Sequence, residues 1–140
     1  MIEIFRVKSN EQMNIVSSIC REVFADEMCL SAKIETDKED NDSINVLAFV
    51  NGEPAGCGRL LPMGEYAIIE NVAVRRSFRR IGIGTGICKL LIALAEDTIA
   101  EKACLKTQPD IAEFFMRLGF EISNIPTDDD VQEITMTRKV

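Results

Sequence analysis

The chain has 140 residues, of which 46% are hydrophobic, and a formal net charge of −7 at pH 7. This length and apolar content predict a single folded domain spanning residues 1–140 and argue against a disordered chain. The negative charge argues against a nucleic-acid partner, because phosphates need a broad basic surface, and it favours a cationic partner such as an amine.

The amino-terminal part of the chain predicts a strand, a helix and a loop. Apolar residues alternate in part over residues 1–7, as they do in a strand. Ser9 or Asn10 can cap a helix whose apolar positions recur at spacings of three and four as far as Val23. Residues 31–43 are too polar for a core, so we expect a loop there.

Three strands are expected next, the first two joined by a hairpin. Two apolar runs flank Asn51 and Gly52, and this dipeptide favours a tight hairpin because both residues tolerate positive φ. A third run, residues 66–74, is rich in β-branched residues and is expected beside the second strand.

The remaining residues predict two helices among further strands. Apolar spacing predicts a helix after Gly82, and Pro109 can occupy the first turn of a second helix that Gly119 ends. Residues 103–107 and the alternating carboxyl-terminal segment predict strands. A strand, a helix and a strand in succession form a right-handed crossover between parallel strands. We therefore expect an α/β (α+β) domain with a mixed, mostly antiparallel sheet.

Residue types exclude several kinds of site. The chain has no histidine, so a serine or cysteine nucleophile activated by an imidazole is excluded, and no spacing of cysteines predicts a zinc site. Five cysteines without a C-x-x-C pair indicate reduced thiols. No apolar run reaches the roughly 18 residues that cross a bilayer, and the charged amino terminus is unlike a signal peptide. We expect a cytoplasmic protein with no metal and no membrane partner.

An arginine-rich segment precedes the helix that starts after Gly82. Residues 75–80 hold four of the 16 Lys and Arg residues, and glycines occupy positions 82, 84 and 86. The first N–H groups of a helix attract anions, and glycines let a ligand approach the backbone, so the segment predicts a pyrophosphate site. Because Ile87 follows Gly86, the segment is neither a P-loop nor a dinucleotide fingerprint. A glycine-rich turn with exposed arginines remains the alternative.

Two motifs resemble those of the GNAT superfamily of N-acetyltransferases. Residues 79–84 read R-x-x-G-x-G, which is similar to the acetyl-CoA-binding signature Q/R-x-x-G-x-G/A, and FFMRLGF at 114–120 resembles the late F-Y-x-K-L-G-F helix ending. The resemblance covers about residues 44–139. More specifically, REVFADE, GRLLP and Gln108 resemble the ElaA/YjcF-like branch. The resemblance to the GNAT superfamily implies a single-domain GNAT-like fold of about six to seven strands flanked by helices, with a central splayed parallel pair.

The resemblance also implies an acetyl-CoA site. The pantetheine arm would pair with a strand as an added strand, backbone amides would hold the pyrophosphate, and the thioester would end between the strands 66–74 and 103–107. The implied contacts are Val72, Ala73 and Val74 for the arm, Arg79, Arg80, Ile81, Gly82, Ile83, Gly84, Thr85 and Gly86 for the pyrophosphate, and Gln108 and Phe115 beside the thioester.

Acetyl transfer needs a neutral amine, a donor for the oxyanion and a proton for the leaving thiolate. Glu70 is our candidate base because it lies on the strand that leads to the arginines, although a plain strand-edge carboxylate is the alternative. The resemblance implies a backbone N–H near Val72 as the oxyanion donor. Many relatives have tyrosine where this chain has Phe115, and the one tyrosine, Tyr66, starts the strand. A water can supply the proton instead.

We therefore predict an acetyl-CoA-dependent N-acetyltransferase that moves an acetyl group to a primary amine of a small molecule or peptide by direct attack on the thioester. The alternative is a non-catalytic or weakly active acyl-CoA-binding regulatory module on the same fold, and a nucleotide-binding module is more remote. Residues 31–43 and 124–130 are expected to shape the acceptor pocket. The assembly is left open, with a homodimer as one alternative.

Overall fold

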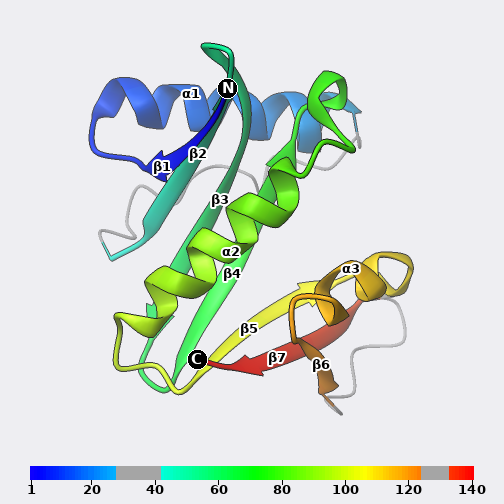
Figure 1. The fold of residues 1–140 in the computed structure, drawn as a ribbon. Helices are drawn as coiled ribbons and strands as arrows, with labels where there is room; N and C mark the ends of the chain where they lie inside the picture. The colour runs from blue at the N-terminus through cyan, green and yellow to red at the C-terminus, as the bar shows by residue number, and fades with distance from the viewer. Residues whose placement is uncertain (28–41, 124–132) are drawn as a thin grey trace.

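The computed structural model describes residues 1–27, 42–123 and 133–140. These residues form one seven-stranded sheet with helices on both faces (Figure 1). Most of the two loops expected at the acceptor pocket, residues 31–41 and 124–130, lies outside the described residues, as does Cys29.

Strands and helices alternate much as the sequence predicts, so the expected mixed single-domain fold is confirmed. The strands are β1 (Ile2–Arg6), β2 (Ile44–Val50), β3 (Glu53–Met63), β4 (Tyr66–Val74), β5 (Lys102–Thr107), β6 (Glu121–Ser123) and β7 (Ile134–Lys139). The helices are α1 (Asn10–Cys20), α2 (Ile83–Glu96) and α3 (Ala112–Met116), with the π-helical η1 (Arg21–Glu27) and the 3₁₀ turns η2 (Arg76–Phe78) and η3 (Pro109–Ile111).

Local signals decide several of these boundaries. The side chain of Ser9 accepts a hydrogen bond from the backbone N–H of Gln12 and caps α1. Asn51 and Gly52 both have positive φ, as the β2–β3 hairpin requires. The predicted second helix is shorter than expected, because the residues from Pro109 to Ile111 form a 3₁₀ turn and only the following five are α-helical.

The sheet has the order β1-β2-β3-β4-β5-β7-β6. All neighbouring strands are antiparallel except β4 and β5, which are parallel and are connected through α2. Their pairing is short: Tyr66, Ala67 and Ile68 face Lys102, Ala103 and Cys104, and no later pair is formed. The two strands then diverge toward α3 (Figure 1), so the predicted splayed parallel pair is present.

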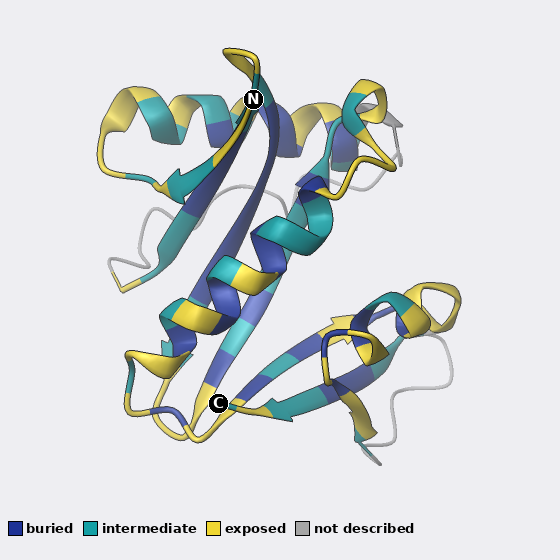
Figure 2. Cartoon of the chain, in the orientation of Figure 1, coloured by how far each residue is buried: buried dark blue, intermediate teal, exposed yellow. Residues whose placement is uncertain are grey.

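Each face of the sheet packs against its own helices. The larger core lies under α2 and α3 and includes Leu60, Ile87 and Leu91, whereas α1 and η1 cover a smaller core around Leu47 and Cys57. Strands β2 and β3 run between these cores and are buried in their central parts (Figure 2). Strand β4 contributes side chains to both cores as well, so its diverging edge is held by packing on both faces of the sheet.

Strand β4 contains a β-bulge. Arg59 pairs with Glu70 and Cys57 pairs with Ala73, so Asn71 and Val72 together stand opposite the single residue between Cys57 and Arg59. Asn71 has φ 56°, in the left-handed region. The bulge reverses the side-chain alternation just where β4 has separated from β5.

Candidate active site

Beyond its pairing with β5, strand β4 presents an open edge, by which we mean the β5-facing backbone of residues 69–74. The N–H of Arg75 donates to Ala55 O. By the alternation of antiparallel pairs, Ala73 also bonds toward β3, and Val72 and Val74 direct their backbone groups to the open edge. An extended ligand can therefore pair with Val72 and with the N–H of Val74 as a strand would, whereas Val74 O already accepts from Arg79 Nε.

The amino terminus of α2 follows this edge after a short turn. Gly82 caps the helix with φ 91°, a conformation that favours glycine, and Arg80 has φ 68°. The N–H of Gly86 donates to Gly82 O in the first helical hydrogen bond. Within the described ranges, no acceptor takes up the backbone N–H groups of residues 81–85. These amides form a positively polarised cradle at the end of the open edge.

Two glycines of this turn allow close packing. A Cβ on Gly84 would lie 3.6 Å from Phe114 Cζ and 3.7 Å from Val74 Cγ2, so the backbone of α2 comes close to both α3 and β4. A Cβ on Gly86 would meet Ile4 Cδ1 of β1. Gly86 thus serves the packing of α2 on the sheet, and its N–H is already used within the helix.

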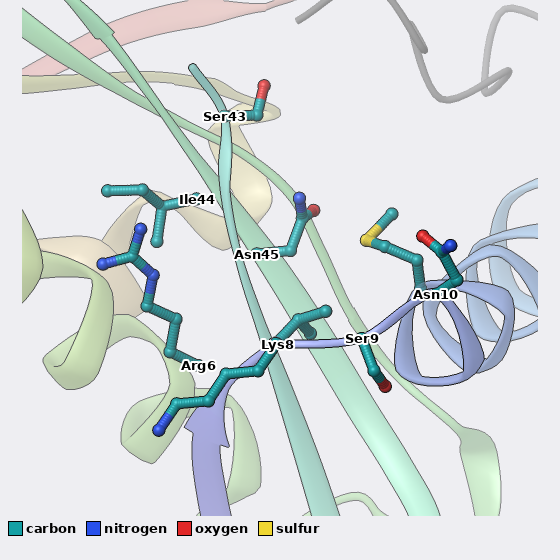
Figure 3. A pocket seen from close by; sticks show the side chains of 9 residues that line it. Arg6, Lys8, Ser9, Asn10, Ser43, Ile44 and Asn45 are labelled. Carbon is teal, nitrogen blue, oxygen red and sulfur yellow. The ribbon is translucent and has the colours of Figure 1, made fainter. Parts of the chain in front are cut away.

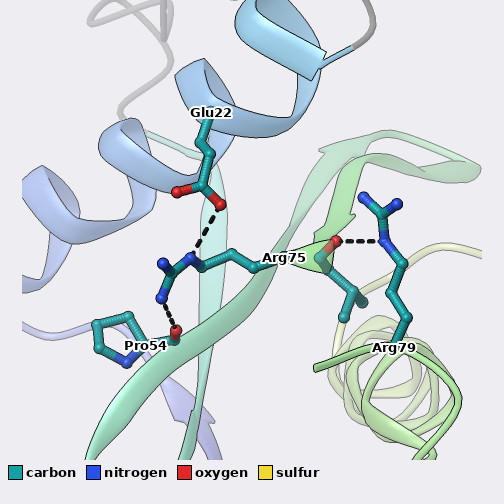
Figure 4. A network of polar contacts seen from close by, with 5 residues as sticks. Glu22, Pro54, Arg75 and Arg79 are labelled. Carbon is teal, nitrogen blue, oxygen red and sulfur yellow. Dashed lines mark hydrogen bonds and ion pairs between the residues drawn. The ribbon is translucent and has the colours of Figure 1, made fainter. Parts of the chain in front are cut away.

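The four arginines of this segment have different surroundings. Arg75 Nε donates to Glu22 Oε2 at 2.9 Å, and its Nη1 donates to Pro54 O at 2.8 Å (Figure 4). Its guanidinium also lies over the Phe78 ring. Arg75 therefore ties the end of β4 to η1 and to the start of β3. This is a structural role, which the sequence analysis did not separate from anion binding.

Arg79 and Arg80 stand closest in sequence to the amide cradle. Arg79 Nε donates to Val74 O at 2.9 Å, which orders the turn against the end of β4 (Figure 4). Arg80 makes no ion pair or side-chain hydrogen bond with any described residue, and it is exposed. Its guanidinium is therefore available to an anion from solvent.

Glu70, the candidate base, lies in β4 immediately before the bulge. Its Oε1 accepts hydrogen bonds from both Nε and Nη2 of Arg59, at 2.9 and 2.6 Å. The Glu70 side chain is 33% exposed, and Oε2 has no partner in the part of the chain that the structure describes. The carboxylate is thus held by one oxygen while the other remains free. Sequence reasoning missed Arg59, because the pair depends on the β3–β4 register.

The far side of the diverging strands is formed by the end of β5 and by α3. Gln108 follows β5 directly and is exposed, whereas Phe115 is buried and packs edge-to-face against Phe114 and Phe120. Phe114 packs against α2 at Gly84, a contact that sequence reasoning did not predict. Tyr66 lies at the paired end of β4, opposite Lys102.

The open edge of β4 lies next to the untaken amides at the start of α2, as the resemblance implied, whereas the bulge in β4 is a feature that the sequence did not predict. The profile of the Acetyltransferase (GNAT) family matches residues 10–120. The chain belongs to this family. It is therefore an acyltransferase whose donor is an acyl-CoA, and the resemblance to the GNAT superfamily found in the sequence is confirmed.

Individual relatives agree with the GNAT assignment. An uncharacterized N-acetyltransferase of Bacillus subtilis, YjcF, is 29% identical over 115 residues, which are 82% of each chain. The crystal structure of Escherichia coli ElaA is 22% identical and covers 99% of each chain with a TM-score of 0.84. The PaiA N-acetyltransferase of Thermoplasma acidophilum, solved with coenzyme A, is 15% identical, with a TM-score of 0.77 over 100% of this chain and 99% of its own. These structures share the fold.

A separate polar pocket lies where β1, α1 and β2 meet (Figure 3). Arg6 and Lys8 line it, and the buried Ser43 hydroxyl, which has no partner in residues 1–27, 42–123 and 133–140, points away from both in this view. The pocket contains none of the residues of the GNAT motifs. Among the described residues, no group of three or more His, Cys, Asp and Glu side chains can hold a metal ion. None of the helices in those ranges is long and apolar enough to span a membrane.

Proposed function

We propose that this protein transfers an acetyl group from acetyl-CoA to a primary amine of a small molecule or peptide, by direct attack of the amine on the thioester. One observation carries this proposal: the untaken backbone amides of residues 81–85 adjoin the open edge of β4. A pyrophosphate needs the first feature and an extended pantetheine arm needs the second.

In the proposed complex, the coenzyme is held mainly by backbone groups. The C=O of Val72 and the N–H of Val74 pair with the pantetheine amides, and Ala73 between them bonds to β3. The amides of residues 81–85 hold the pyrophosphate. Arg80 reaches phosphate oxygens, and Arg79 orders the turn through its bond to Val74 O. Gln108 and Phe115 border the thioester between the diverging strands, and the expected Gly86 contact is limited to packing.

In the proposed reaction, Glu70 beside the bulge acts first, by removing a proton from the acceptor. Glu70 Oε2 takes one proton from the bound ammonium, directly or through a water, and the neutral amine attacks the carbonyl carbon. The carbon–nitrogen bond forms, and the Val72 N–H donates to the oxyanion. The carbon–sulfur bond then breaks, and the thiolate leaves with a second nitrogen proton. The products are the acetamide, the free thiol of coenzyme A and one proton released from Glu70.

A water carries the proton to the leaving sulfur in this scheme. Phe115 has no hydroxyl and is enclosed by two other phenylalanines, while Tyr66 lies at the paired end of β4. The net charge of −7 favours a cationic acceptor, in agreement with a primary amine that binds as ammonium. We propose that the acceptor enters from the α1 face, on which Glu70 and Arg59 lie.

A Gly84→Trp variant tests coenzyme binding, because the indole would fill the space between α2, Phe114 and Val74. We expect calorimetry to show tight binding of acetyl-CoA to the parent and at least a ~10-fold loss in the variant. Ile99→Trp is a matched control, since Ile99 is 86% exposed beyond the far end of α2. Equal affinity in all three proteins would overturn the proposed site.

Thiol release from acetyl-CoA across a panel of amines tests turnover. We expect amine-stimulated release by the parent and a loss of about 100-fold in kcat for Glu70→Gln. The second candidate, an acyl-CoA-binding regulatory module, is favoured by the missing hydroxyl at Phe115. Tight binding without amine-stimulated release would support that candidate.

A further inference from the structure

The ion pair between Arg59 and Glu70 has an asymmetric geometry. Both donors of Arg59, Nε and Nη2, bond to the same carboxylate oxygen, Oε1 of Glu70. A guanidinium can bind the two oxygens of a carboxylate side by side, yet here the second oxygen has no partner in the described residues. The arrangement fixes the carboxyl group and leaves one of its oxygens unused.

The position of the pair in the sheet restricts where that oxygen can go. Arg59 and Glu70 face each other across β3 and β4 at the last regular pair before the bulge. Arg59 is two residues from Cys57 on β3, so it shares the α1 face with the small core around that cysteine. Its side chain is only 11% exposed, which leaves its guanidinium little freedom to move.

The electrostatic effect of Arg59 is felt on this face. The pKa of the Cys20 thiol is lowered, first by the hydrogen bond with Cys57 and then by the Arg59 charge, against the opposing effect of burial. The protonated thiols of Cys57 and Cys20 carry no charge and do not compete for Glu70. Arg59, on the neighbouring strand β3, is the cation that bonds to the Glu70 carboxylate. No other described side chain makes an ion pair with either member.

Stability alone is a weak reason for such a pair. A mostly buried guanidinium loses hydration, and buried ion pairs are often no more stabilising than apolar residues of similar size. A surface pair of this kind would contribute only about 0–1 kcal/mol. The pair lies beside the bulge and the open edge of β4, so it is placed to act in the proposed acyl transfer and not only in stability.

We propose that Arg59 is a positioning residue for acyl transfer: it holds Glu70 through Oε1 so that Oε2 receives the proton of the acceptor ammonium. The inference rests on the proposed function, in which Glu70 is the base. Arg59 touches neither coenzyme nor acceptor and acts through Glu70. It therefore affects kcat, while the affinity for acetyl-CoA, which depends on the amides of α2, stays the same.

A double-mutant cycle tests this role in the full chain. The proteins are the parent, Arg59→Met, Glu70→Gln and the double variant, with Arg59→Lys as the conservative change and Arg6→Met as a control at an exposed arginine at the end of β1. We expect Arg59→Met to lower kcat by roughly 10–100-fold, and Arg59→Lys to recover part of it through a single bond. In the Glu70→Gln background, Arg59→Met should change kcat by less than about 3-fold.

The outcomes separate the inference from the function on which it rests. Equal losses from Arg59→Met in both backgrounds, while Glu70→Gln lowers kcat, would overturn the positioning role alone. Absence of acetyl-CoA binding or of amine-stimulated release in the parent would overturn the proposed function. A variant that does not fold is recognised by circular dichroism. The double variant, which carries no unpaired charge, then supplies the comparison with Glu70→Gln, and a further loss of more than about 10-fold there counts against Arg59 acting through Glu70.

Discussion

Arg75 Nε lies 2.9 Å from Glu22 Oε2, and this ion pair joins the residue after β4 to a π-helical segment on the α1 side of the sheet. The same guanidinium holds Pro54 O and covers the Phe78 ring. The segment that joins β4 to α2 is therefore tied to η1 on the α1 face of the sheet and to the start of β3.

This arrangement predicts unequal effects for the two partners of the ion pair. Arg75→Met removes three contacts and should lower the free energy of unfolding by about 1–2 kcal/mol. Glu22→Gln removes only the ion pair, which is partly exposed, and should cost about 0.5 kcal/mol or less. Urea unfolding of both variants measures the difference. Similar losses for both would mean that the ion pair dominates.

Alanine substitutions at Gly56 and Gly86 should differ sharply in stability. A Cβ on Gly56 would lie 2.7 Å from Ala73 O, a backbone atom of β4 that cannot turn aside. We expect Gly56→Ala to cost about 2–3 kcal/mol.

Gly86 is the matched comparison for Gly56, since its Cβ would meet only the flexible tip of Ile4. The better helix propensity of alanine offsets part of the repacking, so Gly86→Ala should change stability by less than about 1 kcal/mol. Thermal and urea unfolding report both values. A Gly56→Ala protein as stable as Gly86→Ala would contradict the close approach of β3 and β4.

Arg80→Gly should separate the backbone role of this position from its charge. Arg80 has φ 68°, so glycine removes strain and is expected to raise stability by about 0.5–1 kcal/mol. The lost guanidinium should weaken acetyl-CoA binding by about 5-fold or more, whereas Arg80→Lys should keep most of the affinity. Calorimetry and urea unfolding measure the two effects. Unchanged affinity in Arg80→Gly would show that the guanidinium does not reach the phosphates.

Cys88 predicts a loss of stability in alkali. Burial raises the pKa of its thiol from 9.0 to about 12, because the thiolate would lose its hydration in the core under α2. Between pH 9 and 12 the unfolded chain therefore binds fewer protons than the folded one, and stability falls as pH rises.

Above pH 9, Cys88 is expected to lower the free energy of unfolding by about 1 kcal/mol for each pH unit. Cys88→Ala removes this contribution, so its unfolding free energy should decline less steeply between pH 8 and pH 10.5 than that of the parent. Urea unfolding over this range measures both slopes. Parallel slopes would mean that the Cys88 thiol ionises as easily in the folded chain as in the unfolded one.

Local signals in the sequence predicted much of the fold. The Ser9 cap and the turn at Asn51 and Gly52 depend on neighbouring residues only, and the structure confirms them. Gly119 has the positive φ of a helix-ending glycine, although α3 itself ends at Met116. Apolar spacing identified α2 and its buried face. The arginine-glycine motif located the start of α2, and the family match confirms the acyltransferase assignment that this motif supported.

Contacts between strands could not be predicted from local signals in the sequence. The bulge at Asn71, the partner of Glu70, and the insertion of β7 between β5 and β6 all depend on which residues face each other across the sheet. The sequence also grouped the four arginines as one cationic patch, whereas the fold uses Arg75 in a structural tie. A register is decided by the packing of both faces together, so no local pattern records it.

By itself, the sequence determined the order of the helices and strands and the presence of a helix, α2, that begins after a tight, glycine-containing turn. Only the tertiary structure decided that β4 parts from β5 after three residue pairs and that Arg59 grips one oxygen of Glu70. The reason is physical. Helix starts and turns are stabilised by bonds between near neighbours, whereas strand divergence and cross-strand pairs are stabilised by residues that folding brings together from distant parts of the chain.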